Sequence, residues 1–264
     1  MSESNLPRSA RAIVVGGGVI GCSTAYHLAK LGWKEIILLE RKQITSGTTW
    51  HAAGLVTTLR DTESQTKLAQ YSLDLYNDLE RVTGQSTGFI KCGSIQLATS
   101  DAKQEEMRRG CAMARSFGVS NSEISPKEVK ELFPLAYVDD LKCGFYFPDD
   151  GRVNPADVTQ ALAKGAKKMG VKILENLPVL DVIVENGRAC GVKTLEGEIK
   201  AEVVVLCPGM WGYEIGRKVG VNIPLQAAEH YYLISEPIPE VHNKLPILRD
   251  PGRCAYAREE AGKI

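Results

Sequence analysis

The sequence is 264 residues long and 44% hydrophobic, a size and composition that fit about two globular domains with material for a core. Lysine plus arginine and aspartate plus glutamate each number 32, so the formal net charge is zero and no basic block indicates a nucleic-acid partner. No window holds the roughly 18 consecutive apolar residues of a membrane helix, and the seven scattered cysteines lack a CxxC pair, which argues against a zinc site or a disulfide framework.

The first predicted elements are a strand, a turn and a helix. The apolar run AIVV at residues 12–15 is typical of a buried strand, GGGVIG supplies a G-x-G-x-x-G turn, and residues 22–31 carry apolar side chains at helical spacing. A second apolar strand is expected at residues 36–39, with Glu40 at its carboxyl end, 19 residues after the last glycine of the turn. Strand, helix, second strand and acid in this register predict a dinucleotide site far more strongly than the glycines alone.

Each residue of this motif has a physical role at such a site. Gly16 permits the tight turn, Gly18 lets a pyrophosphate approach backbone N–H groups at a helix N-terminus, and Gly21 allows close packing of the helix on the strand. Glu40 can accept hydrogen bonds from a ribose diol. The motif by itself leaves both NAD and FAD open as ligands.

The stretch after the second strand favours FAD. A plain NAD-binding unit would continue into another helix and parallel strand, whereas RKQITSGTTWHAAGLV, residues 41–56, is predicted to be an irregular loop of small residues. Such a loop lets its backbone lie close against a flat ligand. The loop contains Trp50 and His51, and for a loop histidine taken by itself an ordinary hydrogen-bonding role is the simpler interpretation.

The middle of the chain is predicted to be scaffold. Apolar spacing predicts helices over residues 62–82 and 102–117, with a strand in GSIQLATS between them. Ser125 followed by Pro126 has the pattern of an N-cap and a proline at the first helical position, which starts a further helix in SPKEVKELF. None of these elements carries residues that indicate chemistry.

The next part of the chain returns to the dinucleotide-binding pattern. Residues 144–174 repeat the order strand, turn, helix, strand, so that domain is predicted to be discontinuous. Residues 179–184, 188–194 and 198–201, separated by Asn-Gly and Glu-Gly turns, predict an antiparallel meander. The fully apolar run at residues 203–207 then predicts a buried strand of the main sheet, followed by a helix in WGYEIGRKVG.

The last part of the chain predicts one more strand. In AAEHYYLISEP, residues 227–237, alternation places His230, Tyr232 and Ile234 on one face. Arg258, in the charged turn CAYAREEAGKI, could bind a carboxylate in bidentate geometry, although a turn of this kind is more often solvated.

Five stretches together resemble one protein family. GGGVIG, ILLER, TSGTTWHAAGL, PDDGRVNPA and WGYEIGRKVGV are similar to the sarcosine dehydrogenase and dimethylglycine dehydrogenase group of FAD-dependent amine oxidoreductases, in the D-amino-acid-oxidase-like superfamily, and more so to the sarcosine branch. The resemblance implies an α/β fold, with a discontinuous Rossmann-like FAD-binding domain and a substrate domain built on an antiparallel sheet. The expected boundaries are residues 1–92 and 150–224 for the FAD-binding domain, and 93–149 and 225–264 for an incomplete substrate domain.

The resemblance also implies how FAD is held. The histidine of the family's TWHxAGL motif is bonded to the 8α-methyl carbon of the flavin, and the matching residue is His51; a neutral imidazole nitrogen is a competent nucleophile for that carbon. Val179 is expected to contact the adenine end through its backbone, whereas Pro208 stands where family members usually have alanine and removes an N–H. The full set of expected FAD contacts is Gly16, Gly18, Val19, Ile20, Gly21, Glu40, Arg41, Gly47, Thr48, Thr49, Trp50, His51, Ala52, Ala53, Gly54, Leu55, Val179, Gly209 and Trp211.

The implied activity is oxidative N-demethylation of sarcosine or dimethylglycine, without a metal. Hydride passes from the N-methyl carbon to the flavin, and the iminium is hydrolysed to formaldehyde or captured by tetrahydrofolate, with an electron-transfer flavoprotein as electron acceptor. His230 and Tyr232 are expected to orient the substrate amine, and Arg258 to balance its carboxylate. Two other functions remain open: an FAD-dependent oxidase that uses O₂, and a non-catalytic regulatory subunit of the pyruvate dehydrogenase phosphatase type, a branch that lacks the matching histidine.

The resemblance finally bears on extent and location. Family members continue with the rest of the substrate sheet and a C-terminal folate-binding region, so the chain is expected to end within the substrate domain at Ile264, and tetrahydrofolate use would depend on that further region. The mitochondrial matrix is the implied location, although the first 12 residues carry no clear transit peptide, and the cytoplasm is the alternative.

Overall fold

The computed structural model describes residues 6–264, and a targeting signal in residues 1–5 would lie outside the described residues. Contacts within the chain divide it into two units, each assembled from three stretches of sequence. The first unit consists of the residues up to Ala53, Leu79–Thr87 and Pro155–Glu229, and the second of Gly54–Asp78, Gly88–Asn154 and His230–Ile264. Residues 54–78, 88–92 and 150–154 therefore lie in the second unit and residues 225–229 in the first, which differs from the boundaries expected from the sequence.

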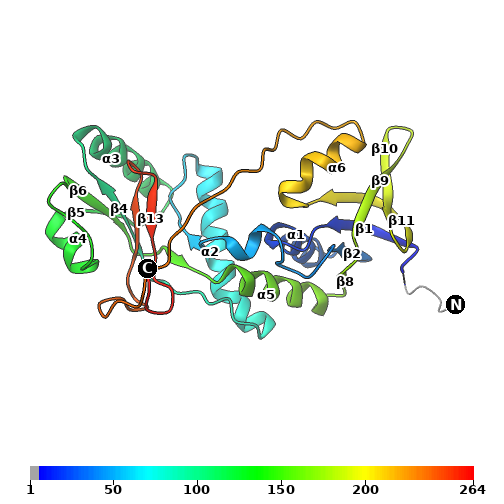
Figure 1. Ribbon diagram of the computed structural model, residues 1–264, viewed down its shortest axis with the longest axis horizontal. Coiled ribbons are helices and arrows are strands. Elements are labelled where there is room, and N and C mark those ends of the chain that lie inside the picture. The colour runs from blue at the N-terminus through cyan, green and yellow to red at the C-terminus, as the bar shows by residue number, and fades with distance from the viewer. Residues whose placement is uncertain (1–5) are drawn as a thin grey trace. The chain divides into compact units, whose positions relative to one another are not determined.

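The first unit is built on a six-stranded sheet with the order β8-β2-β1-β11-β10-β9 (Figure 1). Neighbours among β8, β2, β1 and β11 run parallel, whereas β10 and β9 join the sheet as antiparallel strands. This arrangement confirms the predicted α/β fold with a Rossmann-like unit. The strands are β1 (Ser9–Val15), β2 (Ile36–Leu39), β8 (Lys172–Leu174), β9 (Val179–Glu185), β10 (Arg188–Thr194) and β11 (Gly197–Leu206).

Both faces of the central strands are covered. All four residues of β2 are buried, and so are the last four of β1, which explains why these strands read as continuous apolar runs rather than alternating ones. On one face the side chains form a core with the antiparallel strands and the segment before β9. The buried members of that core are Ala10, Ile13, Val15, Ile37, Leu39, Leu177, Val192 and Ile199.

Two helices of the first unit, α1 (Val19–Lys30) and α5 (Pro155–Lys168), pack against each other. Their close approach depends on a small residue, because a Cβ on Gly165 would lie 2.7 Å from the ring of Tyr26. The remaining helices of this unit are α6 (Gly212–Lys218) and the one-turn 3₁₀ helices η1 (Thr48–His51) and η2 (Gly209–Trp211).

The second unit contains a five-stranded sheet with the order β13-β12-β4-β6-β5. Its strands are β4 (Ser94–Ala98), β5 (Ser122–Ile124), β6 (Cys143–Phe147), β12 (Ile247–Asp250) and β13 (Ala255–Ala257). A two-stranded sheet pairs β3 (Leu55–Val56) with β7 (Gly151–Arg152). The helices are α3 (Asp101–Ser116), α4 (Pro126–Leu132) and α2 (Glu63–Thr83), whose last turn belongs to the first unit.

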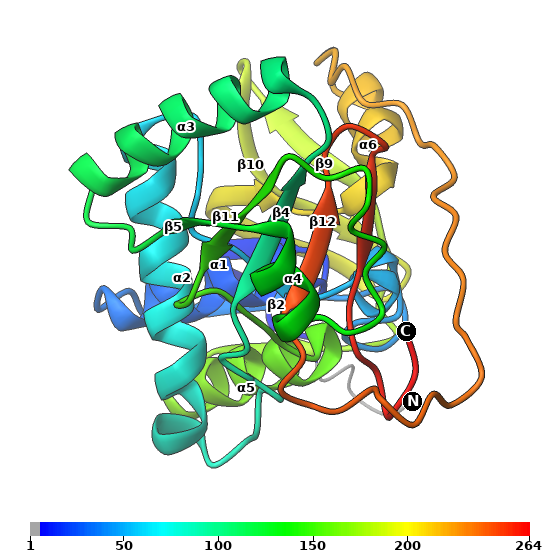
Figure 2. The same ribbon diagram turned by 90° about the vertical axis from the view of Figure 1, so that its left-hand side faces the viewer.

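The five-stranded sheet buries a different helix on each face (Figure 2). Ile95 and Leu97 of β4 pack with α4, and a Cβ on Gly144 would lie 2.6 Å from the Val129 side chain, so this contact is tight. On the opposite face Phe145 and Phe147 of β6 pack with α3, around a group of buried residues that includes Cys111. No helix within residues 6–264 is long and apolar enough to cross a membrane.

Two predicted elements are wrong in detail. Residues 227–237 do not form a strand: none of them belongs to a sheet of the described residues, and the 2.8 Å bond from the Ser235 N–H to the Ile264 carbonyl oxygen does not extend into a ladder. The predicted strands at residues 198–201 and 203–207 are one continuous strand, β11, which pairs with β1 on one side and β10 on the other. Its apolar end is not fully buried, since Val203 is 37% exposed.

Candidate functional site

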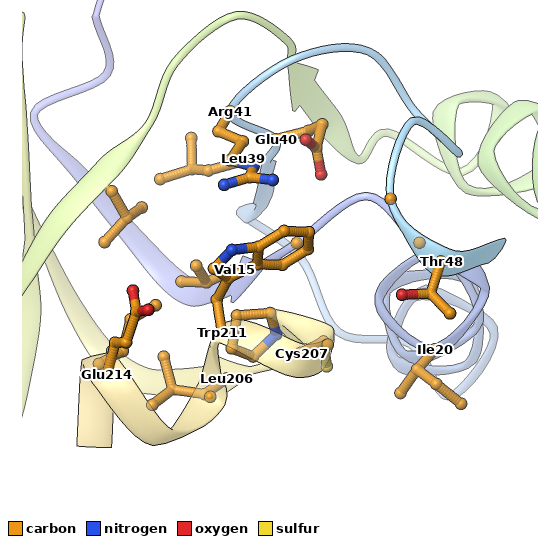
Figure 3. Close-up of a pocket in the computed structure, with 18 of the residues that line it drawn as sticks. Val15, Ile20, Leu39, Glu40, Arg41, Thr48, Leu206, Cys207, Trp211 and Glu214 are labelled. Carbon is orange, nitrogen blue, oxygen red and sulfur yellow. The ribbon is translucent and has the colours of Figure 1, made fainter. Parts of the chain in front are cut away.

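A cavity of about 720 Å³ lies in the first unit, at the carboxyl ends of the parallel strands (Figure 3). Its walls come from the ends of β1, β2 and β11, the glycine turn, the loop after β2, the start of β9 and helix α6. Cavities of this size are usual for cofactors and small ligands. In open α/β sheets, ligands bind at the carboxyl ends of the strands, so the position agrees with a dinucleotide site.

Two glycines of the turn leave no room for a side chain. Gly16 has a φ of 111°, which residues with a Cβ rarely adopt, and a Cβ there would overlap the carbonyl oxygen of Cys207. A Cβ on Gly21 would overlap the carbonyl oxygen of Gly16. Because both obstacles are backbone atoms, no change of side-chain rotamer relieves them. The turn follows this path only with glycine at both positions.

The N-terminus of α1 presents backbone donors to the cavity. Its N-cap, Gly18, supplies no side-chain hydrogen bond, and the first turn of α1 contains no acidic residue. The helix dipole and the N–H groups of this turn therefore favour a bound anion. One of them, the Val19 N–H, donates a 3.0 Å hydrogen bond to the hydroxyl of Thr49 in η1.

Glu40, at the end of β2, is only 9% exposed and its carboxylate is held by backbone groups. Oε2 accepts a 2.6 Å hydrogen bond from the Gly17 N–H, and Oε1 accepts a 2.9 Å bond from the Lys42 N–H. These bonds fix the acid between the glycine turn and the loop that follows β2. Each carboxylate oxygen can accept a further hydrogen bond, so Glu40 keeps the capacity to bind a diol.

Arg41 and Trp211 form a stacked pair inside the cavity. The guanidinium carbon of Arg41 lies 3.7 Å from the centroid of the Trp211 ring, within the range of a cation–π contact, and Figure 3 shows the two side chains together. Trp211 also approaches the loop after β2, since a Cβ on Gly47 would lie 3.6 Å from its ring. Glu214, in the first turn of α6, lines the same cavity. The stack of Arg41 on Trp211 thus joins the end of β2 to the start of α6.

His51 is the last residue of η1, and its side chain is exposed. Its ring stacks on that of Trp50, with the centroids 3.7 Å apart and an interplanar angle of 34°. Neither ring lines the cavity, whereas Thr48, Thr49 and Ala52 of the same loop do. The histidine is therefore carried at the rim of the cavity by a loop whose other members form the wall.

The cavity gathers most of the FAD contacts that were expected from the sequence. Those that line it are Gly16, Gly18, Val19, Ile20, Glu40, Arg41, Gly47, Thr48, Thr49, Ala52, Val179, Gly209 and Trp211. Gly21 packs beneath the turn, Ala53 is not in the wall, and Gly54 and Leu55 lie in the second unit.

Several wall residues were not expected from the sequence. They are Val15, Leu39, Pro178, Leu180, Leu206, Cys207, Pro208, Gly212, Glu214, Ile215, Lys218, Ile223 and Leu225. The strand ends among them could have been found, because the last residues of parallel strands border the ligand site in folds of this class. The residues of α6 and of the segment after it follow no such rule.

Two thiols near the turn form part of the packing. Burial raises the pKa of Cys22 to about 12, and burial also raises the pKa of Cys207, which lines the cavity. The Cys22 Sγ donates to the carbonyl oxygen of Gly17 at 3.6 Å. Because a thiol with a raised pKa is a poor nucleophile, both side chains serve as walls and packing rather than as reactive groups.

The three residues expected to contact the substrate lie in the second unit, and none lines the cavity of the first. His230 and Tyr232 stand in the irregular stretch before β12, where Tyr232 is 69% exposed and the ring centroid of His230 lies 6.5 Å from that of Tyr256. Arg258 forms an ion pair with Glu260. The structure thus brings the expected cofactor residues together in one cavity, and the expected substrate residues belong to the other unit.

The residues of the cavity fit a flavin adenine dinucleotide. The turn has no side chains where a pyrophosphate would approach, the end of α1 offers N–H donors, and Glu40 stands at the end of β2. Pro208 lies in the wall without an N–H, but the following Gly209 has a φ of 60° and no atom within 4 Å of its Cβ position, so the backbone there remains open to close approach.

Comparisons with known proteins agree with this geometry. A sequence profile of the family described as FAD dependent oxidoreductase matches residues 11–264. The chain is 40% identical to 4-methylaminobutanoate oxidase (formaldehyde-forming) of Paenarthrobacter nicotinovorans, covering 100% of this chain and 32% of that protein. It is 39% identical to human mitochondrial sarcosine dehydrogenase, covering 96% and 28%, and 38% identical to the mouse mitochondrial pyruvate dehydrogenase phosphatase regulatory subunit, covering 98% and 30%.

Among solved structures, L-proline dehydrogenase from P. horikoshii is similar with a TM-score of 0.86 and 28% identity. The match covers 98% of this chain and 69% of that one. Of the three relatives found by sequence, 4-methylaminobutanoate oxidase, sarcosine dehydrogenase and the phosphatase regulatory subunit, the chain spans only 28% to 32% of the length.

Proposed function

The chain belongs to the FAD dependent oxidoreductase family, as its motifs indicated, and from that premise we propose that it is the FAD-binding part of an amine dehydrogenase. In the complete protein, FAD would accept a hydride from the N-methyl carbon of sarcosine or dimethylglycine. The cavity carries this proposal, because it unites the glycine turn, the N-terminus of α1 and Glu40 at one edge of the sheet. The 39% identity to sarcosine dehydrogenase supports the substrate class.

The chain's own residues hold the cofactor in this proposal. The N–H groups in the first turn of α1 other than that of Val19, which donates to Thr49, would hold the pyrophosphate, with Gly18 leaving space for its approach. Glu40 would accept from the ribose diol while it keeps its bonds to the glycine turn and to the loop. Arg41 and Trp211, stacked on each other, would form part of the wall that faces the cofactor.

His51 is the proposed point of covalent attachment. The His51 imidazole would hold the flavin through a bond from its nitrogen to the 8α-methyl carbon, formed with loss of one methyl proton and the imidazole N–H proton. Dioxygen would take up the two electrons and the two protons as hydrogen peroxide. The position of His51, exposed at the rim beside Thr48 and Thr49, supports this role because the ring is accessible. Tethering prevents loss of the cofactor and is expected to raise its potential.

A direct test uses the complete purified protein. We expect a flavin absorption spectrum in the visible range, flavin that stays with the polypeptide through acid precipitation, and a flavin adduct on the peptide that contains His51. Anaerobic addition of sarcosine should bleach the flavin and release formaldehyde on turnover. Release of the flavin by acid would show that it is not covalently attached. A flavin that sarcosine does not bleach would contradict the proposed substrate class.

Two relatives support other candidate functions. The identity of 40% to 4-methylaminobutanoate oxidase favours an oxidase, which would consume O₂ with that amine faster than it reduces an artificial dye. The identity of 38% to the phosphatase regulatory subunit favours a non-catalytic role, in which no amine would reduce the flavin. Parallel assays of O₂ uptake, dye reduction and flavin bleaching separate the three functions. Retention of His51 in the loop favours the dehydrogenase over the regulatory subunit in this proposal.

The remaining proposals concern the substrate residues, the electron acceptor and the location. His230, Tyr232 and Arg258 are proposed to approach the substrate in the complete protein, with Arg258 exchanging Glu260 for the substrate carboxylate. An electron-transfer flavoprotein is the proposed acceptor, and the mitochondrial matrix is the proposed location because the related sarcosine dehydrogenase is mitochondrial. The bacterial relative makes the cytoplasm the alternative, and subcellular fractionation decides between them. Tetrahydrofolate capture is tested by folate-dependent loss of free formaldehyde.

A further inference from the structure

One hydrogen bond joins the loop that carries His51 to the end of helix α1. The hydroxyl of Thr49, in η1, accepts the N–H of Val19 at 3.0 Å across 30 residues of sequence. Gly18 leaves room for this contact, since a Cβ there would lie 3.0 Å from the Thr49 hydroxyl oxygen, closer than ordinary van der Waals contact. Within residues 6–264, this is the one side-chain hydrogen bond between η1 and the glycine turn.

Thr49 also helps to form η1 itself. Its carbonyl oxygen accepts the N–H of Ala52 at 3.1 Å, which closes the turn around His51. The same residue therefore closes η1 through its backbone and anchors it through its side chain. Among residues 6–264, no side-chain hydrogen bond anchors the imidazole of His51 in the same way. Its ring stacks on that of Trp50, which is itself 55% exposed.

The other links between this loop and the glycine turn lie farther from the histidine. Glu40 accepts from the Gly17 N–H, and the Thr45 N–H donates to the Gly17 carbonyl oxygen at 3.0 Å. Both bonds hold the beginning of the loop, and the second needs only a backbone N–H. The end of the loop packs against α5, but its link to the turn depends on the Thr49 hydroxyl.

We propose that Thr49 is a positioning residue for flavin attachment: its bond to the end of α1 holds η1, and with it the imidazole of His51, in the place from which the tether forms. This inference rests on the covalent attachment proposed above. Bond formation requires the nitrogen to stay within a few tenths of an ångström of one geometry, so freedom in η1 reduces the fraction of time spent there. The step remains the one described for His51, with dioxygen as the final oxidant.

A positioning role differs from a simple cofactor contact in what it changes. Loss of a contact weakens FAD binding, which raises the FAD concentration needed for half-maximal attachment. Loss of positioning lowers the maximal rate of attachment at saturating FAD and leaves that concentration nearly unchanged. Attachment kinetics measured over a series of FAD concentrations therefore distinguish the two.

The experiment uses the complete protein purified without flavin and then incubated with FAD. Covalent incorporation is followed by flavin fluorescence on denaturing gels for wild type, Thr49→Val, Thr49→Ser and Thr24→Val. Serine keeps the hydroxyl, and Thr24→Val is the matched control because the Thr24 hydroxyl donates to the Ile20 carbonyl oxygen within α1 at 2.8 Å. We expect Thr49→Val to attach flavin roughly fivefold to tenfold more slowly at saturation, the loss that one hydrogen bond carries. Serine and the control should attach it at the wild-type rate.

Each outcome decides the inference. A wild-type maximal rate in Thr49→Val, or a change confined to the half-saturating FAD concentration, overturns the positioning role while the tether stands. Acid-released flavin in the wild type refutes the tether itself and overturns the inference with it. Faster hydrogen exchange at the Val19 amide in Thr49→Val, but not in Thr49→Ser, supports the anchor independently of flavin. If Thr49→Val does not fold, Thr49→Ala is compared with Thr49→Ser in the same two measurements.

Discussion

Glu40 joins the glycine turn to the loop after β2 with the two oxygens of a single carboxylate. One oxygen accepts from Gly17 and the other from Lys42, so the acid organises the backbone on both sides of the cavity edge. A residue whose only role was to bind the ribose would need no bonds to these two backbone N–H groups. Because Glu40 does more, its replacement affects both the shape of the turn and the contact with the cofactor.

We expect Glu40→Ala to weaken FAD binding by about 1–3 kcal/mol, because it removes charge-assisted acceptors from two N–H groups and from the ribose. The measurement is a flavin fluorescence titration of the complete protein in a His51→Ala background, where binding is reversible. Glu202→Ala is the matched control, since Glu202 lies exposed on β11 and pairs only loosely with Arg11, at 3.8 Å. Equal affinities for Glu40→Ala and the control would contradict the role of Glu40.

Two glycine substitutions are expected to have opposite effects. Gly21→Ala places a Cβ against the carbonyl oxygen of Gly16, and we expect it to destabilise the fold by about 1–3 kcal/mol and to reduce flavin occupancy. Gly110→Ala, in α3, meets no atom within 4 Å, and we expect it to stabilise the fold by about 0.5–1 kcal/mol. Urea unfolding measures both effects. A neutral Gly21→Ala would mean that the helix can move away from the turn at little cost.

The sequence identifies the residues of the glycine turn, but it does not show which residues pair with each other in the rest of the cavity. Gly16, Gly21 and Glu40 could be placed because a local motif defines their geometry. The stack of Arg41 on Trp211 could not, since the two residues lie far apart in sequence and no periodicity relates them. Contacts of this kind depend on how β11 and α6 return to the sheet, which only the folded chain shows.

At the level of elements, local signals predicted helices better than strands. Ser125 and Pro126 predict the start of α4, and the structure confirms a capping box in which Ser125 and Glu128 bond reciprocally. The prediction of a strand at residues 227–237 was wrong because alternating side chains define the two faces of a strand but do not supply the neighbouring strand that it must pair with. β11 was split in two because its polar first half and apolar second half read as separate elements.

The contact between α3 and β5 is expected to depend on pH. Hydrogen bonding from the Arg108 guanidinium lowers the pKa of Glu123 to about 2, with a further bond from Gln104. A carboxyl whose pKa is lower in the folded state stabilises the fold above its unfolded pKa, and that contribution disappears as the pH falls toward 2. We expect Glu123→Gln to be less stable than wild type at pH 7 and equally stable near pH 2.

Urea unfolding at a series of pH values measures this difference. Glu131→Gln is the matched control, because Glu131 lies exposed on α4 and pairs with Lys127 only at 3.9 Å. A difference between Glu123→Gln and wild type that stays constant from pH 7 to pH 2 would show that the carboxylate does not link α3 to β5 electrostatically.

At the level of the whole molecule, each unit combines stretches that are distant in sequence, and a buried ion pair fastens one such junction. In the second unit Arg152 of β7 pairs with Glu259, 107 residues later, and its guanidinium also lies 3.4 Å from the Asn243 carbonyl oxygen. Both side chains are nearly inaccessible, and the Arg152 Nε has no hydrogen-bond partner among residues 6–264. The charges are therefore costly unless they are paired.

We expect Glu259→Gln to destabilise the protein by about 3–5 kcal/mol, because it leaves the Arg152 guanidinium buried without its counter-charge. The double variant Arg152→Met with Glu259→Leu should recover much of that loss, since it removes both charges and keeps apolar volume. Thermal and urea unfolding of the complete protein provide the comparison. A double variant less stable than Glu259→Gln would show that the attraction between the two charges exceeds the free-energy cost of removing them from water.

The position of β1 at the centre of the six-stranded sheet has a consequence for folding. β1 is the first element of the chain, yet it pairs on one side with β11, so that Ser9 lies opposite Lys200. During synthesis β1, α1 and β2 leave the ribosome early. Their missing neighbour, β11, emerges only after residues 88–154 of the second unit have been made. Closing so long a loop is slow, and an apolar strand edge stays exposed meanwhile. Nascent chains of this protein should therefore depend on chaperones until β11 has been made.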